Sequence, residues 1–170
     1  IYARTPDGAT QLAASTDRWH LHDDHVHLAP HRRGDPGLRW FDAELLPFVD
    51  ALDRSALLVI DMQNDFCAPG GWTDASGLDY RACRAAIPGV QRAVAAARAH
   101  GMWVVWVYWS NRADLRNLGA PTLYAFKHRP DQRGIGEPLG AGRVLTEGTW
   151  NAEMVDELRP LMRPDDVRIE

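Results

Sequence analysis

The stretch that most constrains the fold is ALLVIDMQNDFCAPGG, residues 56–71, because five apolar residues in a row end directly at the carboxylate of Asp61. Continuous aliphatic runs of this length are typical of β-strands covered on both faces, and such strands belong to parallel sheets. We therefore predict that residues 55–60 form a buried strand of a parallel sheet. The Pro-Gly-Gly that closes the stretch predicts a loop after this strand.

A helix and a second strand follow with the spacing of a βαβ unit. Apolar residues recur three and four positions apart from Ile87 to Ala97, and Gly101 lies where such a helix would end. The next segment, MWVVWVYW at residues 102–109, is a second apolar run of strand length. Strand, helix and strand in this order predict a right-handed crossover between parallel strands.

The last part of the chain extends this pattern. The segment WNAEMVDELRP, residues 150–160, predicts a second helix on which Met154, Val155 and Leu158 share one face. The segment DDVRIE, residues 165–170, predicts a third strand. The predicted fold class is therefore α/β, a Rossmann-like parallel sheet with helices on both faces.

The chain divides into two predicted parts near residue 53. Residues 1–53 show little apolar periodicity, so we predict an N-terminal extended arm that packs on its own domain or on a neighbouring subunit. Residues 54–170 are predicted to form only the N-terminal part of the α/β domain, because a doubly wound sheet has about five strands. We expect the remaining half of the domain to come from a second chain or from a segment outside this sequence.

The arm is rich in histidine. The clustering leaves a metal site open as an alternative to simple packing, but the spacing matches neither HExxH nor a Cys/His knuckle, so we expect no metal. The histidines in question are His20, His22, His25, His27 and His31.

Composition narrows the classes of partner. A net charge of −4 argues against a nucleic-acid partner, since binding to phosphates requires a basic face. The apolar runs are far shorter than the roughly 18 residues needed to span a bilayer, so no membrane partner is expected. Two cysteines, Cys67 and Cys83, are too few for a disulfide framework, which predicts a reducing, cytoplasmic location.

Asp61 is the main candidate for chemistry. Ligands of open parallel sheets bind beyond the carboxyl ends of the strands, where Asp61 meets the residues that follow the second strand. A carboxylate beside apolar walls can have a raised pKa, which suits a general base near neutral pH. The alternative is that Asp61 caps a turn within DMQND.

Three groups of residues resemble a known family. The segments LLVIDMQNDFCAPGG, ARAHGMWVVWV and GRVLTEGTWNAEMVDELRP, the last followed by DDVRIE, resemble the first half of the isochorismatase-like cysteine hydrolases. Within that superfamily, GGWTDASGLD and LTEGTWNAEMVDEL are most similar to the ureidoacrylate amidohydrolase and biuret hydrolase branch. The resemblance covers residues 55–170.

The resemblance implies a cysteine-dependent amidohydrolase that cleaves a C–N bond of a small ureido or carbamoyl amide through a thioester. Asp61 matches the aspartate of an Asp-Lys-Cys triad, and the lysine and the cysteine would lie beyond Glu170. Neither Lys127 nor Cys67 matches the position of its triad counterpart. The resemblance further implies a homo-oligomer without a cofactor or a catalytic metal.

Three residues are predicted to bind the substrate. The resemblance implies that Phe66 faces the substrate, because an aromatic residue at this place in the family's pattern commonly does so. Trp109 and Asn111 follow the second strand, close to the same crevice. Phe66 and Trp109 could instead be core residues, and Asn111 could cap a turn.

Two other functions stay open beside the amidohydrolase. One is a catalytically silent module that binds or assembles, which the missing lysine and cysteine would explain. The other is an isochorismatase-type hydrolase of a vinyl ether, which needs no cysteine nucleophile.

Overall fold

The computed structural model describes residues 2–13, 18–32 and 34–170. It divides into two compact units, one formed by Ile1–Ala56 with Ala99–Trp103 and the other by Leu57–Arg98 with Val104–Glu170. Among the described residues no helix is both long enough and apolar enough to cross a membrane.

The first unit contains a six-stranded sheet where the sequence analysis predicted an extended arm. The strand order is β1-β2-β3-β4-β6-β5, and β4 and β6 pair in parallel while the other neighbours are antiparallel. The arm prediction is wrong in this respect, because very short strands with mixed side chains lack the periodicity that reveals longer ones. A domain boundary at residue 53 stays a prediction. The strands are β1 Tyr2–Arg4, β2 Thr10–Ala13, β3 Arg18–Leu21, β4 Val26–His27, β5 Leu38–Phe41 and β6 Phe48–Ala51.

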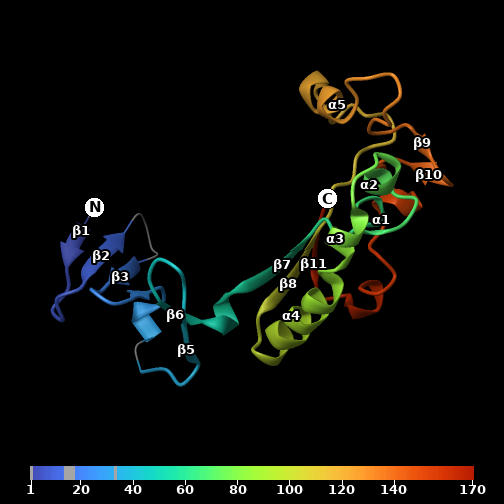
Figure 1. The fold of residues 1–170 in the computed structure, drawn as a ribbon. Helices are drawn as coiled ribbons and strands as arrows, with labels where there is room; N and C mark the ends of the chain where they lie inside the picture. Colours follow the sequence, from blue (N-terminus) through green and yellow to red (C-terminus); the bar gives the residue numbers. More distant parts are fainter. Residues whose placement is uncertain (1, 14–17, 33) are drawn as a thin grey trace. The chain divides into compact units, whose positions relative to one another are not determined.

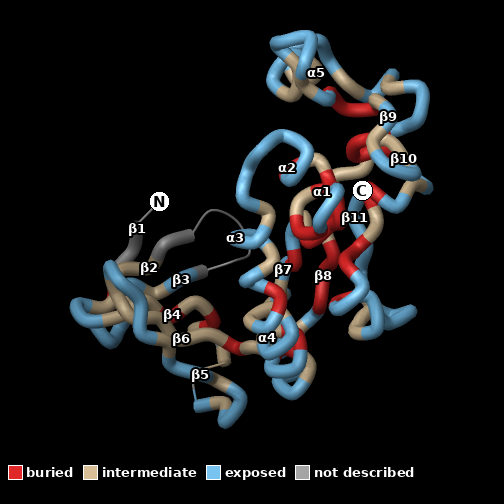
Figure 2. Tube along the Cα trace, turned by 45° about the vertical axis from the view of Figure 1, so that its right-hand side comes forward, coloured by how far each residue is buried: buried red, intermediate tan, exposed pale blue. Residues whose placement is uncertain are grey.

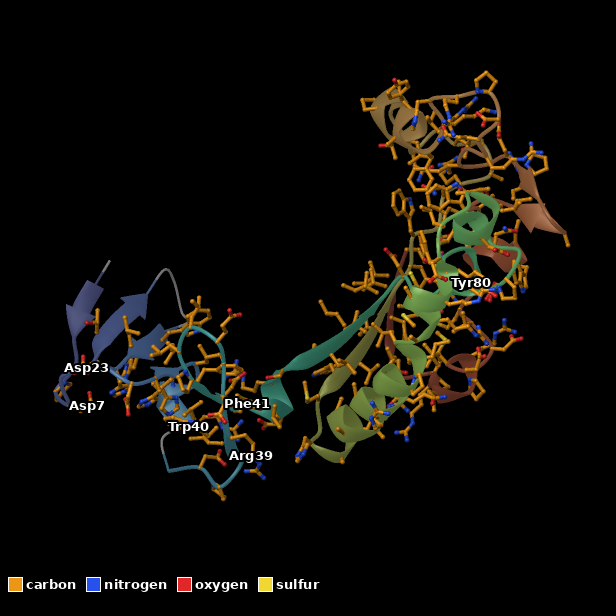
Figure 3. The ribbon with its side chains drawn as sticks, in the orientation of Figure 1. Asp7, Asp23, Arg39, Trp40, Phe41 and Tyr80 are labelled. Atoms are coloured by element: carbon orange, nitrogen blue, oxygen red, sulfur yellow. The ribbon has the colours of Figure 1, made fainter. Side chains whose placement is uncertain are left out.

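Aromatic pairs hold the edge of this sheet together. Phe41 on β5 stacks on Phe48 of β6 with ring centroids 4.8 Å apart, and Figure 3 labels Phe41 and the preceding Trp40 on β5. The Trp40 ring lies 4.8 Å from that of His25, which stacks in turn on His22. In the described part of the chain no three His, Cys, Asp or Glu side chains are grouped to hold a metal ion, and the His31 side chain lies outside that part.

The predicted parallel sheet is confirmed. It consists of β7 Ala56–Ile60, β8 Trp103–Val107 and β11 Val167–Ile169 in the order β11-β8-β7 (Figure 1). β11 and β8 pair in parallel with Val167 opposite Val105. At the other side of β8, the N–H of Asp61 donates to the Val107 carbonyl at 3.0 Å.

The predicted crossover helix is confirmed as α4, Ile87–Ala99, which lies along the sheet in Figures 1 and 2. Gly101 follows it with a φ of 70°, the left-handed conformation in which glycine commonly ends a helix. The helix is tied to the segment before β11, because Arg98 donates to Asp166 at 2.6 Å. The Trp106 indole of β8 donates to the same carboxylate at 2.8 Å.

Burial differs between the two predicted strands. Val104, Val105 and Trp106 of β8 are buried, as expected, and buried segments concentrate along this strand and α1 (Figure 2). Leu58 and Ile60 of β7 are each 55% exposed, so the expectation that this strand is covered on both faces is wrong for the described chain. Side chains alternate between the faces of a strand, and the elements described here cover one face of β7.

The helix predicted over residues 150–160 is absent. Two short 3-10 turns, Trp150–Ala152 and Arg159–Leu161, replace it, and Met154 forms an antiparallel bridge with Gln63. Side chains from another segment bind the carbonyl groups that a helix would use itself, as described below. The three apolar residues expected to share a face are all buried, namely Met154, Val155 and Leu158.

Short elements complete the second unit around the ends of β7 and β8. The remaining helices and strands are α1 Asn64–Cys67, α2 Trp72–Ala75, α3 Tyr80–Arg84, α5 Ala120–Phe126, β9 Pro138–Leu139 and β10 Gly142–Arg143.

Candidate functional site

Asp61 lies at the carboxyl end of β7 and turns the chain out of the sheet. Its φ of 55° is in the left-handed region, which few residues other than glycine adopt and which aspartate tolerates better than most. Strained backbone of this kind is found disproportionately at functional sites. Burial raises the pKa of the half-buried Asp61 carboxyl, and the nearby main-chain N–H of Trp109 opposes this shift.

Gln63 connects the ends of the two strands through its side chain. Its Oε1 accepts from the Trp109 N–H at 2.7 Å, and its Nε2 donates to the Trp109 carbonyl at 3.0 Å. The same Nε2 donates to the carbonyl of Ala152 at 2.7 Å. The buried amide thus pairs with a peptide group as a neighbouring strand would, and it holds Trp109 beside Asp61.

Asn64 binds the same distant segment. Its Nδ2 donates to the Trp150 carbonyl at 2.8 Å, and its main-chain N–H donates to the carbonyl of Glu153 at 2.9 Å. Together with Gln63, Asn64 replaces the hydrogen bonds that a helix over residues 150–160 would form within itself.

Asp65 is the centre of a buried network. Its Oδ1 accepts from the Trp72 N–H at 2.9 Å and from the Asn151 Nδ2 at 2.7 Å, and its Oδ2 accepts from the Leu145 N–H at 2.7 Å. Burial raises the pKa of the Asp65 carboxyl, and the three donors oppose the shift. Leu145 has a φ of 46°, so the bond to Asp65 helps to hold a conformation that leucine rarely adopts.

Phe66 and Trp109 lie close together, and a contact of either ring with substrate stays a prediction. Their ring centroids are 6.4 Å apart, and Trp109 makes an edge-on contact with Phe126 of α5 at 5.0 Å. The Trp72 ring extends this cluster, 4.6 Å from that of Phe126. These partly buried rings pack on a small core of Ile135, Val144 and Leu145.

Asn111 is buried and engaged with Leu145. Its main-chain N–H and its Nδ2 both donate to the Leu145 carbonyl at 2.9 Å, and its own carbonyl accepts from Glu147. The Asn111 side chain therefore connects the end of β8 to the loop that Asp65 also holds. A contact with substrate stays a prediction.

Cys67 and Lys127 lie in settings unlike those of a nucleophile and its partner. Cys67 is 1% exposed, and burial raises the pKa of its thiol to about 11, which keeps the thiol protonated at neutral pH. Lys127 forms an ion pair with Glu137 in the connection after α5. The geometry agrees with the sequence analysis, which gave neither residue a triad role.

The sequence analysis missed Gln63, Asp65 and Asn151 as organising residues. Gln63 and Asp65 belong to a cluster of polar residues directly after a buried strand, which the sequence analysis interpreted as a possible turn cap within DMQND. Several of their partners lie between 46 and 89 residues away in the chain, a separation that the local pattern does not reveal.

Comparison with known proteins places these residues in context. Residues 55–170 match the family described as Isochorismatase domain. A crystal structure of a cysteine hydrolase from Pseudomonas syringae pv. phaseolicola 1448A has a TM-score of 0.51 at 23% identity, covering 79% of this chain and 50% of its own. An isochorismatase family protein from Desulfovibrio vulgaris subsp. vulgaris str. Hildenborough has a TM-score of 0.46 at 27% identity, covering 68% of this chain and 52% of its own. The chain thus spans about half the length of these two proteins.

Proposed function

Because the chain belongs to the isochorismatase family, we propose that it forms part of a cysteine hydrolase that cleaves a C–N bond of a small ureido or carbamoyl amide. The observation that carries the proposal is Asp61, half-buried at the end of β7 beside Trp109, with a pKa raised by burial. The triad lysine and cysteine would lie outside residues 1–170.

The proposed reaction uses Asp61 as a carrier of protons. Asp61 takes the proton of the cysteine thiol, and the thiolate attacks the amide carbonyl carbon. The C–N bond breaks as Asp61 gives that proton to the departing nitrogen, leaving a thioester. Asp61 then takes a proton from water, and the resulting hydroxide attacks the thioester carbonyl carbon. The C–S bond breaks to release the carboxylic product, and Asp61 returns the proton to the departing thiolate, which restores both the thiol and the Asp61 carboxylate.

The substrate would lie between the strand ends and the aromatic rings. Phe66 and Trp109 are already in contact and present flat apolar surfaces to a planar ureido group. Asn111 would act here by holding the end of β8 through Leu145. The similarity of GGWTDASGLD and LTEGTWNAEMVDEL to the ureidoacrylate and biuret branch supports the choice of substrate. We also propose a cytoplasmic homo-oligomer.

A second candidate is a catalytically silent module for binding or assembly. It is favoured by the buried, protonated thiol of Cys67 and by the pairing of Lys127 with Glu137. Neither group is suited to act as a nucleophile or its activator in the described chain.

Ammonia release from a panel of carbamoyl amides by the full-length protein tests the proposal. The Asp61→Asn variant should lose at least about a hundredfold in kcat/KM while its circular dichroism spectrum is unchanged. The matched control is Asp165→Asn, an exposed carboxylate of the same unit, which should keep full activity. Absence of ammonia from every amide would favour the silent module, and hydrolysis of a vinyl ether alone would favour the isochorismatase-type reaction.

A further inference from the structure

The Gln63 side chain accepts a hydrogen bond that the main chain of β7 would accept if the strand continued. The N–H of Asp61 donates to the Val107 carbonyl, so in a parallel ladder the Trp109 N–H would donate next to the Asp61 carbonyl. The left-handed φ of Asp61 turns the chain away at this point. The Gln63 Oε1 accepts the Trp109 N–H instead, at 2.7 Å.

The ladder position of this N–H is next to Asp61, and the N–H also acts on the Asp61 carboxyl. Its effect on Asp61 is to favour the ionised form, which lowers the pKa against the larger effect of burial. The hydrogen bond of this N–H goes to the amide oxygen of Gln63, and the Asp61 carboxylate competes for the same donor. Gln63 also holds the Trp109 carbonyl through Nε2, which fixes the orientation of the peptide between them.

We propose that Gln63 is a positioning residue for Asp61, because its amide holds the Trp109 peptide and limits the hydrogen bond that this N–H gives to the carboxylate. The inference rests on the proposed function, in which Asp61 must both accept and return a proton. A carboxylate that received the full hydrogen bond would be a weaker base.

Among the described residues, this N–H is the main polar group that acts on the pKa of Asp61. Within that part of the chain, no charged side chain contributes to the shift in the pKa of Asp61. The titratable neighbour is the Cys67 thiol of α1, whose own pKa is raised in part by Asp61. That thiol is neutral at neutral pH.

The test is a carbon-13 NMR titration of the Asp61 carboxyl in the full-length protein, compared between Gln63→Leu and Asn64→Leu. In Gln63→Leu the Trp109 N–H turns to the carboxylate, so the pKa of Asp61 should fall by about half a unit to one unit. The matched control Asn64→Leu also removes a buried amide bound to the 150–154 segment, and it should leave the pKa unchanged. The acid limb of the kcat/KM profile should move with the NMR value.

An unchanged pKa in Gln63→Leu, or an equal shift in both variants, overturns the inference. If Gln63→Leu does not fold, Gln63→Met serves, since it keeps the length of the side chain and lacks the amide. The pKa of Asp61 should fall in this variant too, and an unchanged value would contradict the inference. The titration needs no turnover, so a shift without any ammonia release contradicts the proposed function alone.

Discussion

Asp65 and Asn151 are joined by a buried hydrogen bond of 2.7 Å, although 86 residues separate them in the chain. The bond connects α1, directly after the first strand, to the 3-10 turn that replaces the expected helix near the end of the chain. Because the Asp65 carboxylate also binds the main chain at Trp72 and Leu145, one side chain joins four segments around the end of the sheet.

The first prediction concerns this network. Asp65→Ala leaves two buried donors and one partly buried donor without their acceptor, and each buried unsatisfied donor costs about 1–3 kcal/mol. We expect the free energy of unfolding, measured with urea, to fall by about 3 kcal/mol or more. The control Asp74→Ala removes an exposed carboxylate bound to the Gly70 N–H and should cost under about 1 kcal/mol. Equal losses in the two variants would contradict the organising role of Asp65.

The second prediction concerns the cost of holding Asp61 at the strand end. Its folded-state pKa is raised, so the protonated form is favoured by folding and the stability it contributes is lost as pH rises from about 4 through the raised value. Asp61→Asn removes the charge and keeps a residue that tolerates a left-handed φ. The free energy of unfolding at pH 7 should therefore be higher for the variant than for the wild type, by on the order of 0.5 kcal/mol because the group is only partly buried.

Urea unfolding at two pH values checks this second prediction. The advantage of Asp61→Asn should vanish near pH 3, where the wild-type carboxyl is protonated in both states. A variant that is less stable than the wild type at pH 7 would show that Asp61 is placed for stability.

The third prediction concerns the two thiols. Burial keeps Cys67 protonated, with a pKa of about 11, whereas Cys83 on α3 is exposed. Iodoacetamide at pH 7 should modify Cys83 and leave Cys67 untouched in the native protein, because the thiolate is the reactive form. Peptide mass spectrometry reports each site separately, and unfolding in urea should make the two react alike. Fast modification of Cys67 in the native protein would contradict its protonated state and make it a candidate nucleophile.

Part of this architecture could be predicted from the sequence, since it is encoded by local periodicity. Local pattern alone indicates three elements. They are β7, from the aliphatic run that ends at Ile60, α4, from its amphipathic pattern, and β8, from its apolar run. The position of Asp61 at a strand end follows from the first of these, and the approach of Phe66 to Trp109 follows from the geometry of parallel strands.

Other features depend on contacts between distant segments and could not be predicted in this way. Residues 150–160 have a helical apolar pattern, yet the side chains of Gln63 and Asn64 bind carbonyls there, and the segment forms short 3-10 turns instead of a helix. The exposure of Leu58 follows from which face of β7 the described elements cover, and the apolar run itself carries no such information. The strands described in residues 1–53 are two to four residues long, which is too short for any one of them to show a pattern.

The last prediction concerns the close approach of the chain at Gly71, where α2 begins. A Cβ atom at this position would lie 2.3 Å from the Asn64 carbonyl oxygen and 2.8 Å from the Asp65 Cα, and main-chain atoms cannot move aside as a flexible side chain can. Its φ of −74° suits any residue, so Gly71→Ala tests packing without backbone strain. We expect a loss of about 1–3 kcal/mol in the free energy of unfolding, together with reduced activity because Asp65 is displaced.

Gly89→Ala is the matched control, since its Cβ would meet only the end of Arg92 at 3.9 Å and alanine favours the helix by up to about 1 kcal/mol. Calorimetry should therefore show opposite shifts in Tm for the two variants, and a neutral Gly71→Ala would mean that α1 and α2 are not packed this closely.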